Sequence, residues 1–134
     1  MKILLDTHIA LWAIADSKKL SSEVITVLKS VENEIYYSIA SVWEVAIKHK
    51  LHPDKMPISE QEFVEFCEKV GFIPLSITAE QIYFISTLER PQNAPSHNDP
   101  FDRLMIAQAK KEQMKFMTHD TLIPWYNEPC IYSV

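Results

Sequence analysis

The chain has 134 residues, of which 47% are hydrophobic and 23% charged, and its formal net charge is −5. A soluble domain of this size buries enough apolar surface to fold without disulfides or a structural metal. Its single glycine, Gly71, excludes the glycine-rich loops with which P-loop and Rossmann proteins bind phosphates, and it excludes the GxSxG elbow of α/β-hydrolases.

The two cysteines and the N-terminus indicate where the protein works. Cys67 and Cys130 stand far apart and form no CxxC pair, which excludes a zinc knuckle and fits a reducing compartment. The apolar run at residues 3–5 is too short for a signal peptide or a membrane span. We therefore expect a cytoplasmic protein without a membrane segment.

The acidic balance argues against binding nucleic acid by charge alone, because such affinity comes from lysine and arginine on phosphates. The excess of acidic over basic residues is confined to one segment, however. Residues 51–100 contain 3 basic and 8 acidic side chains, whereas the segments on either side are balanced. Nucleic-acid binding by the rest of the chain stays open.

In the N-terminal part, strand and helix patterns alternate. Residues 3–5 predict a strand and residues 9–15 an apolar helix. A second helix is expected to begin near Ser21 or Ser22. Residues 35–38 then predict a strand and residues 41–50 a helix.

The middle of the chain carries two helix-capping signals. Residues 59–62 read Ser-Glu-Gln-Glu, a capping box before a helix that Gly71 is expected to end. Residues 72–75 predict a strand, in which Pro74 indicates a sheet edge or the strand's end. Residues 78–81 repeat the capping signal.

The C-terminal part contains one long helix and two strands. Asp99 and Pro100 suit the N-cap and the first position of a helix that ends at the basic residues 110–111. Residues 115–118 and 130–132 predict strands. Strands separated by helices indicate an α/β fold with a mostly parallel sheet of four or five strands, covered on both faces. We find no repeat or linker and expect one domain over residues 1–134.

Acidic residues are predicted at the edge where these strands end, which is where parallel sheets bind ligands. Asp6 directly follows the first strand, and Asp120 comes two residues after residues 115–118. Glu44 lies in an apolar stretch of a helix that begins at the same edge, and Asp99 and Asp102 lie in the first turn of another.

Converging carboxylates repel one another and resist burial unless a cation neutralises them. Oxygen ligands without a nearby histidine or cysteine pattern favour Mg²⁺ or Mn²⁺ over zinc. Such ions act on phosphates, because they orient and ionise a water and neutralise charge on the leaving group.

Four segments carry a resemblance to the PIN-domain family, specifically to the VapC-like ribonuclease toxins of toxin–antitoxin pairs. They are LLDTH (residues 4–8), SIASVWEVAIK (38–48), DPFDRLMIAQA (99–109) and THD (118–120), in the family's order and spacing. The resemblance implies a three-layer α/β/α sandwich. It also implies a Mg²⁺- or Mn²⁺-dependent endoribonuclease that is held inactive by an antitoxin and self-associates as a homodimer or a larger oligomer.

The resemblance also assigns roles to individual residues. The family's acidic quartet matches Asp6, Glu44, Asp102 and Asp120. Asp6 and Asp102 are the implied principal metal ligands, while Glu44 and Asp120 bind a second ion or act through water. Asp99 matches an additional acid, and Thr7 and Thr118 match hydroxyl positions beside the acids.

Simpler interpretations of these residues stay open. Asp99 is explained equally well as a helix cap. Glu44 can form an exposed pair with Lys48 four residues later, which stabilises a helix by only about 0.3–0.5 kcal/mol. The histidines show no ligand spacing, and solvated or capping roles are expected for them. His8 and His119 flank the proposed site and can reach RNA.

Alternative functions are a catalytically inactive PIN-like interaction module, or a phosphatase or signalling domain that uses Asp6 as an aspartyl-phosphate acceptor. The phosphatase chemistry commonly needs a second aspartate at position 8, where this chain has His8. The apolar first helix, with Ile9, Leu11, Trp12 and Ile14, is a candidate surface for an antitoxin, although burial in the sandwich is the simpler account.

Overall fold

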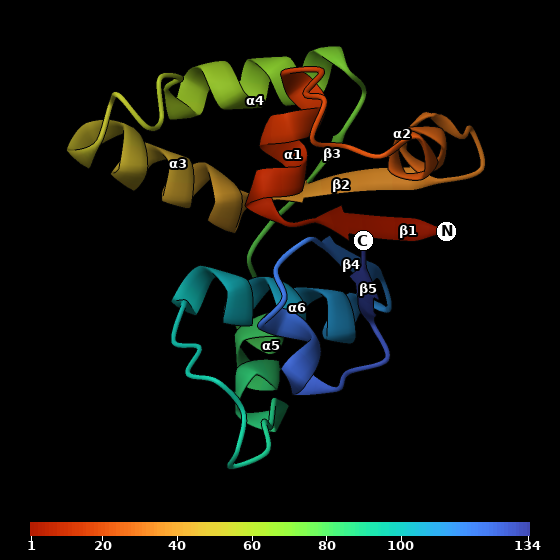
Figure 1. Cartoon of the computed structure of the whole chain (residues 1–134), viewed down its shortest axis with the longest axis vertical. Coiled ribbons are helices and arrows are strands. Elements are labelled where there is room, and N and C mark those ends of the chain that lie inside the picture. The colour runs from red at the N-terminus through yellow and green to blue at the C-terminus, as the bar shows by residue number, and fades with distance from the viewer.

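The structure, a computed structural model, describes residues 1–134 and is built around a parallel sheet with the strand order β3-β2-β1-β4-β5 (Figure 1). The strands are β1 (Lys2–Leu5), β2 (Glu34–Ser38), β3 (Ile73–Leu75), β4 (Lys115–Thr118) and β5 (Ile131–Ser133). All four neighbouring pairs are parallel. The predicted parallel sheet is therefore confirmed with five strands.

Helices cover both faces of this sheet and complete a three-layer α/β/α sandwich. The elements are α1 (Thr7–Ile14), α2 (Ser22–Lys29), α3 (Ile39–Leu51), α4 (Glu60–Lys69), α5 (Ala79–Tyr83) and α6 (Pro100–Glu112), with short 3₁₀ helices η1 (Phe84–Thr87) and η2 (Ile123–Tyr126). Figure 1 shows α1 to α4 on one side of the strands and α5 and α6 on the other. Helix α3 packs on α4 and also contacts α6. No helix combines the length and the apolar character that crossing a membrane requires.

Two hydrophobic cores follow from the alternation of side chains along the strands. Ile3 and Leu5 point into the core under α1, α2 and α4, whereas Leu4 between them belongs to the core under α6. Met117 and Phe116 divide between the two cores in the same way. This explains why the strands appear in the sequence as continuous apolar runs.

The predicted capping signals are confirmed. The Ser59 and Glu62 capping box opens α4, and the same reciprocal pair of hydrogen bonds forms between Thr78 and Gln81 at α5. Gly71 follows the end of α4 with a φ of +87°, a left-handed conformation that glycine adopts without strain. Pro74 lies in β3 at the edge of the sheet, where a missing N–H is tolerated.

A few boundaries differ from the predicted ones. Helix α3 begins at Ile39, two residues earlier than expected, because the Ser38 side chain accepts a hydrogen bond from the Ala40 N–H. Helix α1 begins at Thr7, directly after Asp6. Strand β5 is shifted by one residue. The carboxyl ends of β1, β2 and β4 therefore lead directly into the segments that carry the acids.

Candidate metal centre and active site

Asp6 lies at the junction of β1 and α1 and is buried, with 5% of its surface exposed. Its Oδ2 accepts a hydrogen bond of 2.6 Å from the Thr118 hydroxyl at the end of β4. Burial raises the pKa of Asp6, the Thr118 hydrogen bond and the charge of His8 partly lower it, and the charge of Glu44 raises it again. The structure therefore places Asp6 in the predicted position at the strand ends, next to Thr118.

Glu44 projects from α3 and is also buried. The Thr7 hydroxyl donates to its Oε1 at 2.7 Å, and the Thr7 oxygen also lies 2.7 Å from Ser41 Oγ. The Lys48 ammonium lies 2.6 Å from its Oε2. The interpretation of Glu44 as half of an exposed ion pair is therefore wrong, because the pair exists but its carboxylate is buried.

Asp99 acts as the predicted cap of α6. Its Oδ1 accepts hydrogen bonds from the backbone N–H groups of Phe101 and Asp102, at 2.9 and 3.1 Å. Its second oxygen is not used in this cap. Capping and metal binding thus involve different atoms and do not exclude each other.

Asp102 has the most perturbed carboxyl group of the site. Burial, followed by the charges of Asp6, Asp99, Glu44 and Asp120, raises its pKa to about 8. All four charges act on this one group because helix α6 begins where β1, α3 and the segment after β4 meet. The charges of the other four predicted acids therefore all reach Asp102.

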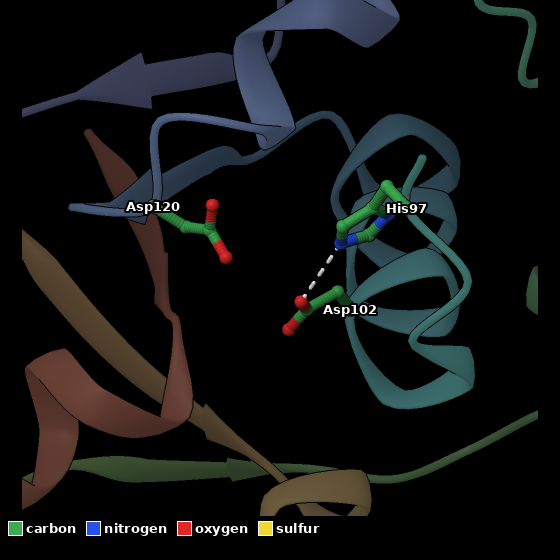
Figure 2. Close-up of side chains that lie close together, drawn as sticks. All are labelled: His97, Asp102 and Asp120. Atoms are coloured by element: carbon green, nitrogen blue, oxygen red, sulfur yellow. Dashed lines mark hydrogen bonds and ion pairs between the residues drawn. The ribbon is translucent and has the colours of Figure 1, made fainter. Parts of the chain in front are cut away.

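Asp120 follows β4 and is half-buried. Its backbone N–H donates to Thr118 Oγ1 at 3.0 Å, and its Oδ1 accepts from the Leu122 N–H at 2.7 Å. Thr118 thus connects Asp120 with Asp6. Figure 2 shows the Asp120 carboxylate turned toward Asp102 and a third side chain, His97.

His97 was expected to be solvated or to cap a helix, and this expectation is wrong. The ring is buried, and its Nε2 lies 3.1 Å from Asp102 Oδ2 (Figure 2). Its Nδ1 lies 2.8 Å from the Tyr126 hydroxyl. Burial lowers the pKa of His97; Asp120 raises it, and Arg90 lowers it. The loop before α6 has no periodicity from which burial could be predicted, so the sequence offered no signal for this contact.

His97, Asp102 and Asp120 each offer one ligand atom, and these atoms all lie within 4.8 Å of one another. An imidazole nitrogen therefore lies beside the carboxylates that the sequence predicts as ligands. Carboxylates suit Mg²⁺ and Mn²⁺, and one imidazole in addition suits Mn²⁺. Burial, and after it neighbouring carboxylates, raise the pKa values of Asp6 and Asp102, and a divalent cation would neutralise these carboxylates, so the residues fit one.

The other histidines agree with the expected peripheral roles. His8 is exposed and packs on Trp12, with ring centroids 6.1 Å apart. His119 is exposed and its Nδ1 lies 2.8 Å from the carbonyl oxygen of Val134. In the sequence, His8 comes two residues after Asp6, and His119 directly precedes Asp120.

Comparisons with known proteins agree with this architecture. The PIN domain family model matches residues 3–124. A chain in the crystal structure of VapBC2 from Rickettsia felis bound to a DNA fragment from their promoter superposes with a TM-score of 0.70 at 17% identity, over 100% of this chain and 99% of that one. A chain of a toxin–antitoxin complex from Klebsiella pneumoniae gives a TM-score of 0.62 at 17% identity, over 98% and 99%. No curated protein matches the sequence.

Proposed function

The chain belongs to the PIN-domain family, and we propose that it is a Mg²⁺- or Mn²⁺-dependent endoribonuclease, the toxin of a toxin–antitoxin pair. The observation that carries the proposal is the position of Asp102, a buried carboxyl group that offers a ligand atom within 4.8 Å of those of His97 and Asp120. Carboxylates gathered from separate elements suit a divalent cation, and metal-dependent phosphodiester cleavage uses such a cation.

Each acid receives a role from its position. We assign Asp6 and Asp102 as the principal metal ligands, with Glu44 and Asp120 binding a second ion or acting through a water. Asp99 caps α6 with Oδ1, and its other carboxylate oxygen can bind the metal ion. A bound divalent ion supplies Lewis acidity, which lowers the pKa of a water and neutralises charge on the phosphate.

Hydroxyl groups hold the acids in place. Thr118 fixes one oxygen of Asp6 and leaves the other for a ligand. Thr7, itself held by Ser41, fixes Oε1 of Glu44, whose Oε2 accepts from Lys48. Such partners restrict the rotamers of the ligands before any ion or substrate arrives. The reaction forms one bond between water oxygen and phosphorus and breaks one between phosphorus and a ribose oxygen.

An antitoxin partner is proposed on the resemblance and on the two complexes with similar chains. A cavity of about 490 Å³ lies beside α1 and is lined by apolar side chains that include Leu11, Ile14, Ile58 and Phe66. Its apolar lining suits a hydrophobic segment of the antitoxin. His8 lies at the same cavity, so a bound segment would end close to the acids.

Self-association is proposed for α3. Ile39, Trp43, Ile47 and Leu51 recur every four residues and leave 38%, 59%, 36% and 66% of their surfaces exposed. A second copy that packs on this stripe would bury it. Sedimentation velocity tests this: we expect a dimer that Trp43→Glu converts to a monomer, and a monomeric wild-type protein would contradict it.

The enzymatic proposal is tested by incubating the purified protein with single-stranded RNA. Cleavage is expected with Mg²⁺ or Mn²⁺ and not with EDTA. Asp6→Asn should be inactive, and Asp54→Asn, which removes an exposed acid outside the site, should retain activity. No cleavage by the wild-type protein with added metal, or equal cleavage by Asp6→Asn, defeats the proposal.

A further inference from the structure

Lys48 contributes the positive charge closest to the acids. It lies one helical turn after Glu44 on α3, with its ammonium 2.6 Å from Glu44 Oε2. The Lys48 side chain is 42% exposed, whereas that of Glu44 is 5% exposed. The ammonium therefore stands between the buried carboxylate and the solvent.

Both oxygens of Glu44 are engaged in this arrangement. Oε1 accepts from Thr7 and Oε2 accepts from Lys48. Thr7 is buried and held by Ser41, so its bond has little freedom to move. Lys48 is the more mobile partner, because its ammonium ends a flexible four-carbon stem. A cation that takes Oε2 therefore competes with the ammonium of Lys48 for that oxygen.

The charge of Lys48 acts on more than one acid. Partial burial lowers the pKa of Lys48, but the hydrogen bond and charge of Glu44, followed by the charges of Asp99 and Asp102, raise it above its ordinary value. No other lysine and no arginine forms an ion pair with an acid of the site. Lys48 is thus the one lysine that forms an ion pair with an acid of the site.

We propose that Lys48 exchanges partners during the reaction: its ammonium competes with the divalent cation for Glu44 and, once displaced, binds an RNA phosphate at the edge of the site. The proposal rests on the proposed nuclease function. An ammonium at this edge can reach solvent on one side and the acids on the other. A lysine binds phosphate as a flexible point charge and needs no fixed geometry.

A purely structural role makes a different prediction. If Lys48 only supports α3 through its pair with Glu44, its removal leaves metal affinity unchanged or lowers it by loosening Glu44. Competition between Lys48 and the cation predicts a change of metal affinity in the opposite direction. Removal of Lys48 should strengthen metal binding and weaken RNA binding in the same protein.

The test is a calorimetric titration of the full chain with Mn²⁺, together with RNA cleavage at saturating Mn²⁺. Lys48→Met is expected to bind Mn²⁺ about threefold to tenfold more tightly than the wild-type protein and to require a higher RNA concentration for half-maximal rate. Lys48→Arg keeps the charge and should resemble the wild-type protein. Lys29→Met, at an exposed lysine without an ion pair on α2, is the matched control and should change neither value.

Lys48→Gln provides a second neutral side chain should Lys48→Met fail to fold. An unchanged or weaker Mn²⁺ affinity of the neutral variants overturns the proposal for Lys48, even if the wild-type protein cleaves RNA. Absence of Mn²⁺ binding by the wild-type protein overturns both this proposal and the metal-dependent function. The two failures are therefore distinguishable.

Discussion

Nε2 of His97 lies 3.1 Å from Oδ2 of Asp102, while Nδ1 of the same ring lies 2.8 Å from the hydroxyl of Tyr126. Once a bound cation or a high pH ionises Asp102, its carboxylate can only accept a hydrogen bond, so Nε2 then carries the proton and donates to it. The neutral ring then accepts a hydrogen bond from the Tyr126 hydroxyl at Nδ1. Tyr126 thus fixes the tautomer with which His97 orients Asp102.

Substitution of His97 should therefore weaken metal binding. His97→Phe keeps a ring in the buried position but removes the donor to Asp102, and we expect a loss of about tenfold or more in Mn²⁺ affinity. His97→Gln, whose amide can donate, should lose less. Calorimetric titration with Mn²⁺ measures both, with His52→Gln at an exposed position as control. Wild-type affinity in His97→Phe would show that His97 does not act on Asp102.

Thr118 makes a separate contribution through Asp6. Its hydroxyl bond lowers the pKa of Asp6, so Thr118→Val should raise that pKa further and weaken Mn²⁺ binding at neutral pH by about threefold to tenfold. Thr118→Ser should restore most of the affinity. The deficit of Thr118→Val should shrink as pH rises, because protons then compete less for Asp6. A deficit that is independent of pH would contradict this explanation.

The raised pKa of Asp102 predicts an unusual dependence of the free energy of unfolding on pH. Its pKa is about 8 in the folded protein and near the ordinary aspartate value of 3.8 in the unfolded chain. Between these values the folded state holds a proton that the unfolded state has lost, so the free energy of unfolding falls as pH rises from about 4 to about 8. The fall is at most about 1.4 kcal/mol per pH unit.

Urea denaturation in EDTA measures this effect. Asp102→Asn has no proton to lose, so its stability relative to the wild-type protein should increase by about 1 kcal/mol or more between pH 5 and pH 8. The same comparison in saturating Mn²⁺ should favour the wild-type protein, because bound metal stabilises the folded state. An identical difference between the two proteins at pH 5 and pH 8 would contradict the raised pKa of Asp102.

The apolar cavity beside α1 predicts where the antitoxin binds. Leu11→Glu places a charge in this cavity and should abolish recovery of a complex on co-expression with the product of the adjacent reading frame. RNA cleavage by the free variant should persist. Val31→Glu, at a position 99% exposed, is the control and should retain the complex. Recovery of a wild-type amount of complex with Leu11→Glu would place the partner elsewhere.

The sequence predicted those features that depend on local physical chemistry. Capping residues such as Ser59 and Asp99 satisfy N–H groups within three residues, so their spacing alone locates the helix starts. Asp6 and Asp120 follow apolar strands, and parallel strands bring their carboxyl ends to one edge. The position of the acids was predictable for this reason.

Features that depend on distant contacts were not predictable. His97 is buried because it meets Tyr126, which lies 29 residues later, and no local pattern encodes that contact. The burial of Glu44 beside a half-buried Lys48 arises because α3 packs between α4 and α6. The sequence marks Ser41 only as part of a motif. Its hydrogen bond to Thr7 could not be predicted, because it joins residues 34 positions apart.

The central claim is that Asp6 and Asp102 act together in one metal centre that cleaves RNA. Its most direct test is the rate of single-stranded RNA cleavage in saturating Mn²⁺ by the wild-type protein, Asp6→Asn, Asp102→Asn and the double variant. Residues that act as a unit give non-additive losses. We predict a loss of about a thousandfold or more for each single variant and little further loss in the double variant. Wild-type rates in either single variant would contradict the account, as would losses that multiply in the double variant.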